Sequence, residues 1–232
     1  MEDPIIELRH VWKTYQMGSN VVNALKDVSM KIHKGEFVAV VGPSGSGKST
    51  MMNIIGCLDI PSKGHVFLDG HDIAKLSESD LATIRGKKIG FVFQQFNLIP
   101  TLTALENATL PMMFQETTTK QRQETGMKLL THFGLKERAF HKPTELSGGQ
   151  SQRVAISRAL ANNPEVVLAD EPTGNLDSKT GIEVMETLKN IHLKEGKTVI
   201  LVTHDLNLVH HVERVIYLKD GMIEKVKKKV IR

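Results

Sequence analysis

Hydrophobic and polar residues alternate near the start of the chain. Residues 5–11 and 23–32 follow this period of two, which predicts two half-buried strands. Residues 12–20, between them, are expected to form a turn-rich loop. Residues 64–68 and the following Asp69-Gly70 predict another strand and its turn. The N-terminal part of the chain should therefore form a small antiparallel sheet.

Other hydrophobic runs are short and continuous. Runs of this kind suit strands that are buried on both faces of a parallel sheet. Two further runs flank Lys219-Asp220-Gly221 and predict a final hairpin. The predicted buried strands are residues 36–41, 89–93, 166–169 and 198–202, and the predicted hairpin strands are residues 214–218 and 222–226.

Helical spacing of hydrophobic residues marks other segments. Met127, Leu130 and Phe133 carry this spacing in a region that also contains polar stretches. Residues 96–142 are therefore expected to be a helical insertion that does not fold as a separate domain. The predicted helices are residues 51–58, 120–135, 151–161 and 180–194.

Composition narrows the classes of function. The 232 residues fit one domain, and aromatic residues make up 5% of them, too few to stack the bases of single strands. With a net charge of only +4, no nucleic-acid partner is expected. Cys57 is the only cysteine, so an internal disulfide is excluded.

No run approaches the roughly 18 apolar residues of a membrane span. Residues 1–4 are acidic and lack the features of a signal peptide, so we predict a cytoplasmic protein. Residues 225–232 are basic and are expected to be a solvated tail, with support at an anionic membrane surface as the alternative.

Residues 42–49 read G-x-x-x-x-G-K-S, the phosphate-binding P-loop pattern. The pattern lies between a predicted strand and a predicted helix, which is the context that a P-loop requires. Backbone N–H groups in such a loop converge on phosphate oxygens, and glycine permits their close approach. Lys48 is placed for the β- and γ-phosphates, and the Ser49 hydroxyl for Mg²⁺. The residues predicted to bind the nucleotide here are Gly42, Ser44, Gly45, Ser46, Gly47, Lys48, Ser49 and Thr50.

Two further motifs follow the P-loop. Asp170 and Glu171 end a predicted buried strand, where Asp170 can hold Mg²⁺ through water and Glu171 can polarise an attacking water. Residues 146–150 read L-S-G-G-Q before a predicted helix. The double glycine exposes N–H groups at a helix start and predicts an anion site. The alternative for Ser147 is a simple helix N-cap.

The order of these motifs resembles the ATP-binding cassette (ABC) ATPases, and the resemblance covers essentially the whole chain. It implies an α/β fold, in which a P-loop core with a mainly parallel sheet carries an N-terminal antiparallel β subdomain and an inserted helical subdomain. Residues 1–232 would form one ABC ATPase domain, with residues 1–95 and 156–232 as the core and about 96–155 as the helical subdomain. The motifs that carry the resemblance are residues 42–49, Gln94, residues 146–150, residues 166–171, Asn175-Leu176-Asp177 and His204.

The resemblance also implies roles for residues outside the P-loop. Tyr15 resembles the aromatic residue that stacks on adenine, with Trp12 as the alternative, and Asp177 resembles an aspartate at the dimer interface. Gln94 resembles a glutamine that senses Mg²⁺ and the attacking water, although Gln95 could also reach the site. His204 resembles a histidine beside the γ-phosphate. The signature that would touch ATP on the opposite subunit is Ser147, Gly148, Gly149 and Gln150.

These assignments define the predicted chemistry. Glu171, His204 and Gln94 are the expected catalytic residues, and Ser49, Gln94 and Asp170 the expected Mg²⁺ ligands. Ser151 departs from the Gln or Glu common after the signature, and it is expected to begin the helix without contacting phosphate. ATP and Mg²⁺ are the implied cofactors.

A closer resemblance is to the ATP-binding subunits of lipoprotein-releasing and macrolide-exporting systems. It is carried by residues 53–59, 91–100 and 170–177. It implies a homodimer around two ATP molecules, at the inner face of the cell membrane, that drives a permease-type subunit on a separate chain for export or extraction. The alternative is a regulatory ATPase that pulls on a membrane protein without transport. A third possibility, a nucleic-acid ABC ATPase, is disfavoured because the chain has neither a coiled-coil insertion nor a second cassette.

Overall fold

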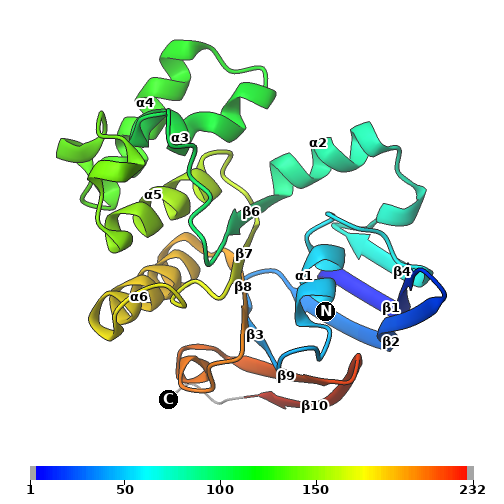
Figure 1. Ribbon diagram of the computed structural model, residues 1–232. Coiled ribbons are helices and arrows are strands. Elements are labelled where there is room, and N and C mark those ends of the chain that lie inside the picture. Colours follow the sequence, from blue (N-terminus) through cyan, green and yellow to red (C-terminus); the bar gives the residue numbers. More distant parts are fainter. Residues whose placement is uncertain (1–3, 229–232) are drawn as a thin grey trace.

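The structure is a computed structural model and describes residues 4–228 (Figure 1). An antiparallel sheet has the strand order β2-β1-β4-β5, and a second sheet has the order β10-β9-β3-β8-β7-β6. In the second sheet, β9, β3, β8, β7 and β6 run parallel, and β10 pairs antiparallel with β9. The strands are β1 (Pro4–Met17), β2 (Asn20–His33), β3 (Phe37–Val41), β4 (Lys63–Leu68), β5 (His71–Asp72), β6 (Ile89–Val92), β7 (Val166–Asp170), β8 (Thr198–Thr203), β9 (Arg214–Lys219) and β10 (Met222–Lys228).

The helices lie around these sheets and in a separate group at the upper left of Figure 1. Short 3₁₀ helices connect several of them. The α-helices are α1 (Lys48–Ile55), α2 (Glu78–Lys88), α3 (Ala104–Thr109), α4 (Thr119–His132), α5 (Gly148–Leu160) and α6 (Ser178–Glu195). The 3₁₀ helices are η1 (Ile73–Lys75), η2 (Leu110–Phe114), η3 (Lys136–Arg138), η4 (Pro143–Glu145) and η5 (Leu208–His211).

The parallel sheet is buried on both faces, as its continuous hydrophobic runs predict. Successive side chains of a strand point to opposite faces, so Val38 and Val40 of β3 join one core while Phe37 and Ala39 join the other. The first core contains α1 and the antiparallel sheet. The second contains residues of α5 and α6. Consequently, α1 and α5 lie against opposite faces of the sheet.

A third, smaller core lies in the helical region. Leu105 of α3 and Leu130 of α4 are buried in it, together with Val154 of α5. Further along α5, Ile156 belongs to the core of the parallel sheet. One helix therefore joins the helical region to the sheet, and the predicted subdomain boundary near residue 155 falls within that helix.

The fold class predicted from the sequence is confirmed, but several local predictions were wrong. Helix α1 spans Lys48–Ile55 and not residues 51–58, and α4 ends at His132 and not at residue 135. Residues 12–20 are not a loop, because β1 continues to Met17 and only Gly18-Ser19 form the turn. Cross-strand pairs such as Tyr15 with Val22 extend the hairpin. This pairing supplies hydrogen-bond partners for the backbone groups of a segment whose polar sequence had suggested a loop. The helix after the signature begins at Gly148 and not at residue 151, because Ser147 caps it.

The tail and leader predictions fall partly on residues 1–3 and 229–232, which lie outside the described residues. Within residues 4–228, each helix is too short or too polar to cross a membrane. Helix α2 was not among the predicted elements. Leu81 and Ile84 are its only hydrophobic residues larger than alanine, and they pack partly buried against the first core, so the hydrophobic spacing in this segment is too short to mark a helix.

Candidate functional site

The glycine-rich loop connects β3 to α1 and is held tightly from two sides. Gly47 has φ 99°, and a Cβ on it would lie 2.5 Å from the carbonyl oxygen of Ala24 in β2. The N–H of Gly221, in the turn between β9 and β10, donates to the Ser46 carbonyl oxygen at 3.0 Å. Only glycine fits at position 47, and the β9–β10 turn holds Ser46 in place through this hydrogen bond.

The loop presents cationic and hydrogen-bonding groups. Lys48 Nζ donates to the carbonyl oxygens of Gly42 and Pro43, at 2.8 and 2.9 Å, so it spans the loop. Ser46 is 2% exposed, and its hydroxyl is a buried polar group without a hydrogen-bond partner in the described chain. No acidic residue occupies the first turn of α1, whose N-terminus carries a positive partial charge. This loop is suited to an anion.

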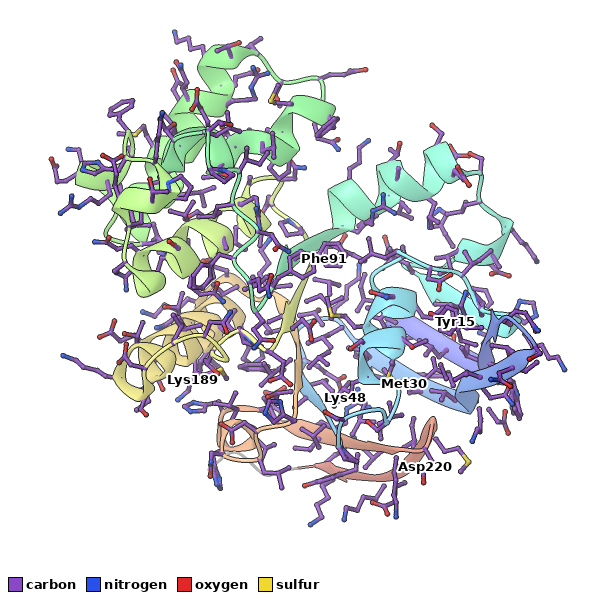
Figure 2. All side chains as sticks on the ribbon, in the orientation of Figure 1. Tyr15, Met30, Lys48, Phe91, Lys189 and Asp220 are labelled. Atoms are coloured by element: carbon purple, nitrogen blue, oxygen red, sulfur yellow. The ribbon has the colours of Figure 1, made fainter. Side chains whose placement is uncertain are left out.

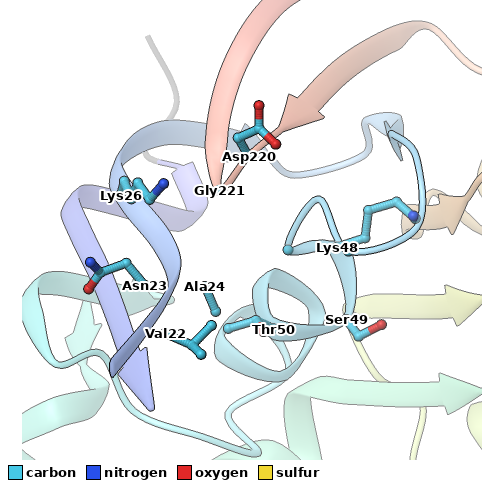
Figure 3. A pocket seen from close by; sticks show the side chains of 11 residues that line it. Val22, Asn23, Ala24, Lys26, Lys48, Ser49, Thr50, Asp220 and Gly221 are labelled. Atoms are coloured by element: carbon cyan, nitrogen blue, oxygen red, sulfur yellow. The ribbon is translucent and has the colours of Figure 1, made fainter. Parts of the chain in front are cut away.

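A cavity of about 390 Å³ opens beside the loop (Figure 3). Its wall combines the P-loop and α1 with β2 and the β9–β10 turn. In Figure 3, Val22 and Asn23 come from β2, and Asp220 from the turn. The lining residues are Val22, Asn23, Ala24, Lys26, Gly45, Gly47, Lys48, Ser49, Thr50, Asp220 and Gly221.

Tyr15 lies on β1, opposite Val22, and does not itself line this cavity. Its hydroxyl donates to Asp59 at 3.0 Å, and Lys13 Nζ lies 5.1 Å from the ring centroid. Burial and the hydrogen bond to Asp59 raise the pKa of Tyr15. Figure 2 shows Tyr15 on the antiparallel sheet, apart from Lys48. The ring is held next to a strand that forms the cavity wall.

The carboxylates of Asp170 and Glu171 lie at the carboxyl end of β7. Burial, reinforced by the charge of Glu171, raises the pKa of Asp170, and the nearby Lys48 opposes this shift. A cation beside Asp170 would favour its ionised form. Asp170 and the Ser49 hydroxyl therefore supply hard oxygen donors of the type that Mg²⁺ prefers, and this donor set fits the predicted metal.

Glu171 is held by three donors. Thr203 Oγ1 donates to Oε2 at 2.8 Å, and the backbone N–H of His204 donates to Oε1 at 2.8 Å. His204 Nδ1 also lies 2.6 Å from Oε1 and carries the hydrogen for this contact when the carboxylate is ionised. Glu171 has φ 45°, in the left-handed region that residues with a Cβ seldom adopt. The structure thus fixes the carboxylate through both its backbone and its side chain.

Gln94 follows β6 and faces the segment after Glu171. The Asn175 side chain donates to the Gln94 carbonyl oxygen at 3.0 Å, and the two side chains are 3.5 Å apart. A Cβ on Gly174 would lie 2.6 Å from Gln94 Nε2. Gln95 is exposed and lines a separate groove with Phe96. Gln94 is therefore packed against the segment that carries Glu171.

The signature residues lie at the N-terminus of α5. Ser147 is its N-cap, and Gln150 completes a capping box, with Ser147 N–H donating to Gln150 Oε1 at 2.9 Å. A Cβ on Gly149 would lie 2.5 Å from the Thr180 methyl group. Asp177 caps α6 and accepts from Thr180 Oγ1 at 2.6 Å, and these hydrogen bonds lower the pKa of Asp177. The signature and Asp177 therefore form one packed unit.

This unit does not share a side of the sheet with the P-loop. Helix α1 packs on one face, and α5 and α6 pack on the other. The structure brings together the P-loop, Asp170 and Glu171 with His204. It leaves Ser147–Gln150 in a second location of the same chain.

A family model described as "ABC transporter" matches residues 25–174, more than half of the chain. The chain belongs to the ABC transporter family. It is 55% identical over 228 residues to the uncharacterized ABC transporter ATP-binding protein MJ0796 of Methanocaldococcus jannaschii, with 97% of each chain covered. It is 46% identical over 223 residues to the macrolide export ATP-binding/permease protein MacB of a Shewanella species, and the match covers 96% of this chain and 34% of MacB.

A solved structure of an ABC protein has a fold similar to that of this chain. It is a dimeric post-hydrolysis state of the ATP-binding cassette MJ0796 bound to ADP and Pi. The TM-score is 0.88 at 53% identity, with 96% of this chain and 98% of the other covered. The predicted family, its ATPase class and its macrolide-exporter branch are confirmed by these matches. The roles of single residues stay predictions.

Several residues of the ABC site were not found from the sequence. Lys26 and Gly221 line the cavity, although neither belongs to a recognisable motif. Thr203 was not among the predicted site residues, yet its hydroxyl donates to the Glu171 carboxylate. Gln152 reaches the backbone directly after Glu171. The only available signal was position, since Thr203 and Gln152 each lie within two residues of a motif.

Proposed function

We propose that this chain is the ATP-hydrolysing subunit of a membrane transport complex and works as a homodimer around two ATP molecules. The observation that carries the proposal is the separation of two phosphate-binding elements. The P-loop and the signature helix lie against opposite faces of one sheet, so a single chain cannot enclose one ATP between them. Two antiparallel copies can place each signature on the other copy's P-loop. The dimeric MJ0796 structure supports this arrangement.

In this proposal the P-loop binds the phosphates. Backbone N–H groups of residues 45–50 donate to the phosphate oxygens, and Lys48 pairs with the β- and γ-phosphates. Tyr15 stacks on adenine beside the cavity wall of β2. Ser147, Gly148, Gly149 and Gln150 of the partner copy donate to the γ-phosphate, and Asp177 lies at the interface.

Mg²⁺, held by Ser49, Asp170 and Gln94, would neutralise phosphate charge. Glu171 accepts a proton from water as the water oxygen bonds to the γ-phosphorus. The bond from that phosphorus to the bridging oxygen breaks, leaving ADP and inorganic phosphate. His204 holds the Glu171 carboxylate through its own N–H groups and borders the γ-phosphate. The contacts of Glu171 with Thr203 and His204 support this orientation.

The partner in this proposal is an integral membrane subunit on a separate chain. The MacB relative is named as an ATP-binding/permease protein, and this chain matches about a third of its length. Other relatives, such as MJ0796, match over nearly their whole length. The complex would export or extract a substrate, and this chain would lie at the inner face of the membrane through its partner. Nucleotide-driven closing of the dimer would supply the motion.

The test replaces Glu171 with glutamine. Glu171→Gln keeps the size of the side chain but cannot accept the proton, so ATP should stay intact and hold the dimer closed. Sizing chromatography should show a monomer without nucleotide and a dimer with ATP and Mg²⁺. The matched control is Glu224→Gln on the exposed part of β10, which should hydrolyse ATP at the parent rate. A Glu171→Gln protein that binds ATP but stays monomeric, or hydrolyses it normally, would contradict the proposal.

A further inference from the structure

One hydrogen bond joins the signature helix to the Glu171 segment. Gln152, in the second turn of α5, is 0% exposed, and its Nε2 donates to the carbonyl oxygen of Pro172 at 2.7 Å. A carbonyl oxygen can only accept, so the amide nitrogen must face Pro172. Pro172 directly follows Glu171 in the chain. Across residues 4–228 this is the one hydrogen bond between α5 and residues 170–172.

The other half of the Gln152 amide is unsatisfied. Its Oε1 is buried and has no hydrogen-bond partner in the described part of the chain. An unsatisfied buried polar atom destabilises a fold, so a methionine of similar size would fill this position better on packing grounds alone. Within the described part of the chain, the bond to Pro172 is the one hydrogen bond of this side chain.

That bond acts on a strained segment. Glu171 has φ 45°, and such a conformation persists only where its surroundings hold it. The Glu171 N–H donates to the Val202 carbonyl oxygen at 2.8 Å, and Gly174 N–H donates to the Glu171 carbonyl oxygen at 3.0 Å. The bond from Gln152 is the contact that approaches from the signature helix. A shift of α5 would consequently pull on the peptide next to the Glu171 carboxylate.

The signature and Glu171 belong to different ATP sites. In the dimer, Ser147–Gln150 contact the nucleotide on the partner subunit, while Glu171 serves the nucleotide on its own P-loop. We propose that Gln152 is a positioning residue that couples these two sites. Nucleotide on the partner moves α5, and Gln152 transmits the movement through Pro172 to the orientation of Glu171. This inference rests on the proposed function, because it requires the dimer with two ATP molecules.

The experiment uses Gln152→Met in the full chain. The variant keeps the buried volume and removes the donor to Pro172. The kcat for ATP hydrolysis should fall about tenfold, because the variant loses one buried hydrogen bond that holds the segment next to Glu171. The KM for ATP should stay close to the parent value, because the P-loop is untouched. The Hill coefficient for ATP should fall toward one, since the sites no longer sense each other.

Two further variants of this chain serve as controls for the effect of Gln152→Met. Ser157→Ala removes a different buried polar group from α5, a hydroxyl whose bond to the Arg153 carbonyl oxygen stays within the helix. It should keep the parent kcat and Hill coefficient. The double variant Glu171→Gln/Gln152→Met should still dimerise with ATP, which shows that the signature remains intact.

The outcomes separate this inference from the proposed function. A Gln152→Met protein with the parent kcat and Hill coefficient would overturn the coupling. Loss of ATP-dependent dimerisation in the double variant alone would also overturn it, since Gln152 would then simply maintain the signature. If Glu171→Gln by itself stays monomeric with ATP, the dimer is wrong, and the proposed function fails together with the coupling.

Discussion

Removal of one hydroxyl group tests how Glu171 is held. Thr203 is the last residue of β8 and is 0% exposed. Its Oγ1 donates to Glu171 Oε2 at 2.8 Å and accepts the Asp205 N–H at 3.0 Å. Thr203→Val keeps the shape of the side chain and deletes both hydrogen bonds.

The structure sets the size of the expected effect. A hydrogen bond to a charged group contributes about 1.5–3 kcal/mol, and Asp205 is partly exposed. We therefore expect the free energy of unfolding to fall by about 2 kcal/mol. The carboxylate keeps its two contacts with His204 and can still pivot about Oε1. A loss of about 1.4 kcal/mol of transition-state stabilisation corresponds to a tenfold lower kcat, which is the decrease expected.

The assays are urea unfolding and steady-state ATP hydrolysis. Thr203→Ser retains the hydroxyl and should restore most of the kcat. The matched control is Thr109→Val, because Thr109 is also buried and its hydroxyl bonds to the carbonyl oxygens of Leu105 and Glu106 within α3. That control should have the parent kcat. The reasoning would be refuted by a Thr203→Val protein that is less stable but turns over ATP at the parent rate.

Three other predictions concern the nucleotide and the pH dependence of stability. Lys48→Ala should lose ATP affinity and hydrolysis together, because it removes the side-chain cation of the P-loop; normal activity in the purified variant would exclude the loop as the site. Tyr15→Ala should weaken ATP binding about tenfold or more while changing saturated turnover less, since base–aromatic stacking contributes about 1–3 kcal/mol; an unchanged affinity in a binding titration would remove Tyr15 from the site. Hydrogen bonds and charges from Arg9 and Lys31, Arg9 foremost, lower the pKa of Glu7 to about 2 from 4.5. This stabilisation is present above pH 4.5 and is lost as the pH falls toward 2, so the stability difference between Glu7→Gln and the parent in urea should be largest near neutral pH and shrink over that range; a difference independent of pH would contradict it.

The sequence alone was enough to predict those parts of the site in which consecutive residues act together through their backbone. The P-loop of residues 42–49 binds phosphate through successive N–H groups, so its spacing alone indicates the chemistry. Buried strands such as β7 and β8 were found because a sheet covered on both faces demands an uninterrupted hydrophobic run. The order of the motifs was enough to predict the family.

Local pattern was a poorer guide where pairing between segments determines the structure. Residues 12–17 are polar enough to look like a loop, yet they are strand residues because β2 supplies their backbone partners. Helix α5 begins at Gly148 because the Ser147 and Gln150 side chains satisfy its first N–H groups. Neither outcome follows from the hydrophobic spacing on which the predictions were based.

Contacts between distant residues were decided by the tertiary structure alone. The Gly221 N–H bonds to the Ser46 carbonyl oxygen, Thr203 reaches Glu171, and Gln152 reaches Pro172. Each pair unites residues from different strands, helices or turns, and sequence periodicity reports only which face a residue occupies. The opposite placement of the P-loop and the signature has the same origin. The packing of α1 and α5 on the two faces of one sheet is what makes a second copy necessary in the proposed ATP site.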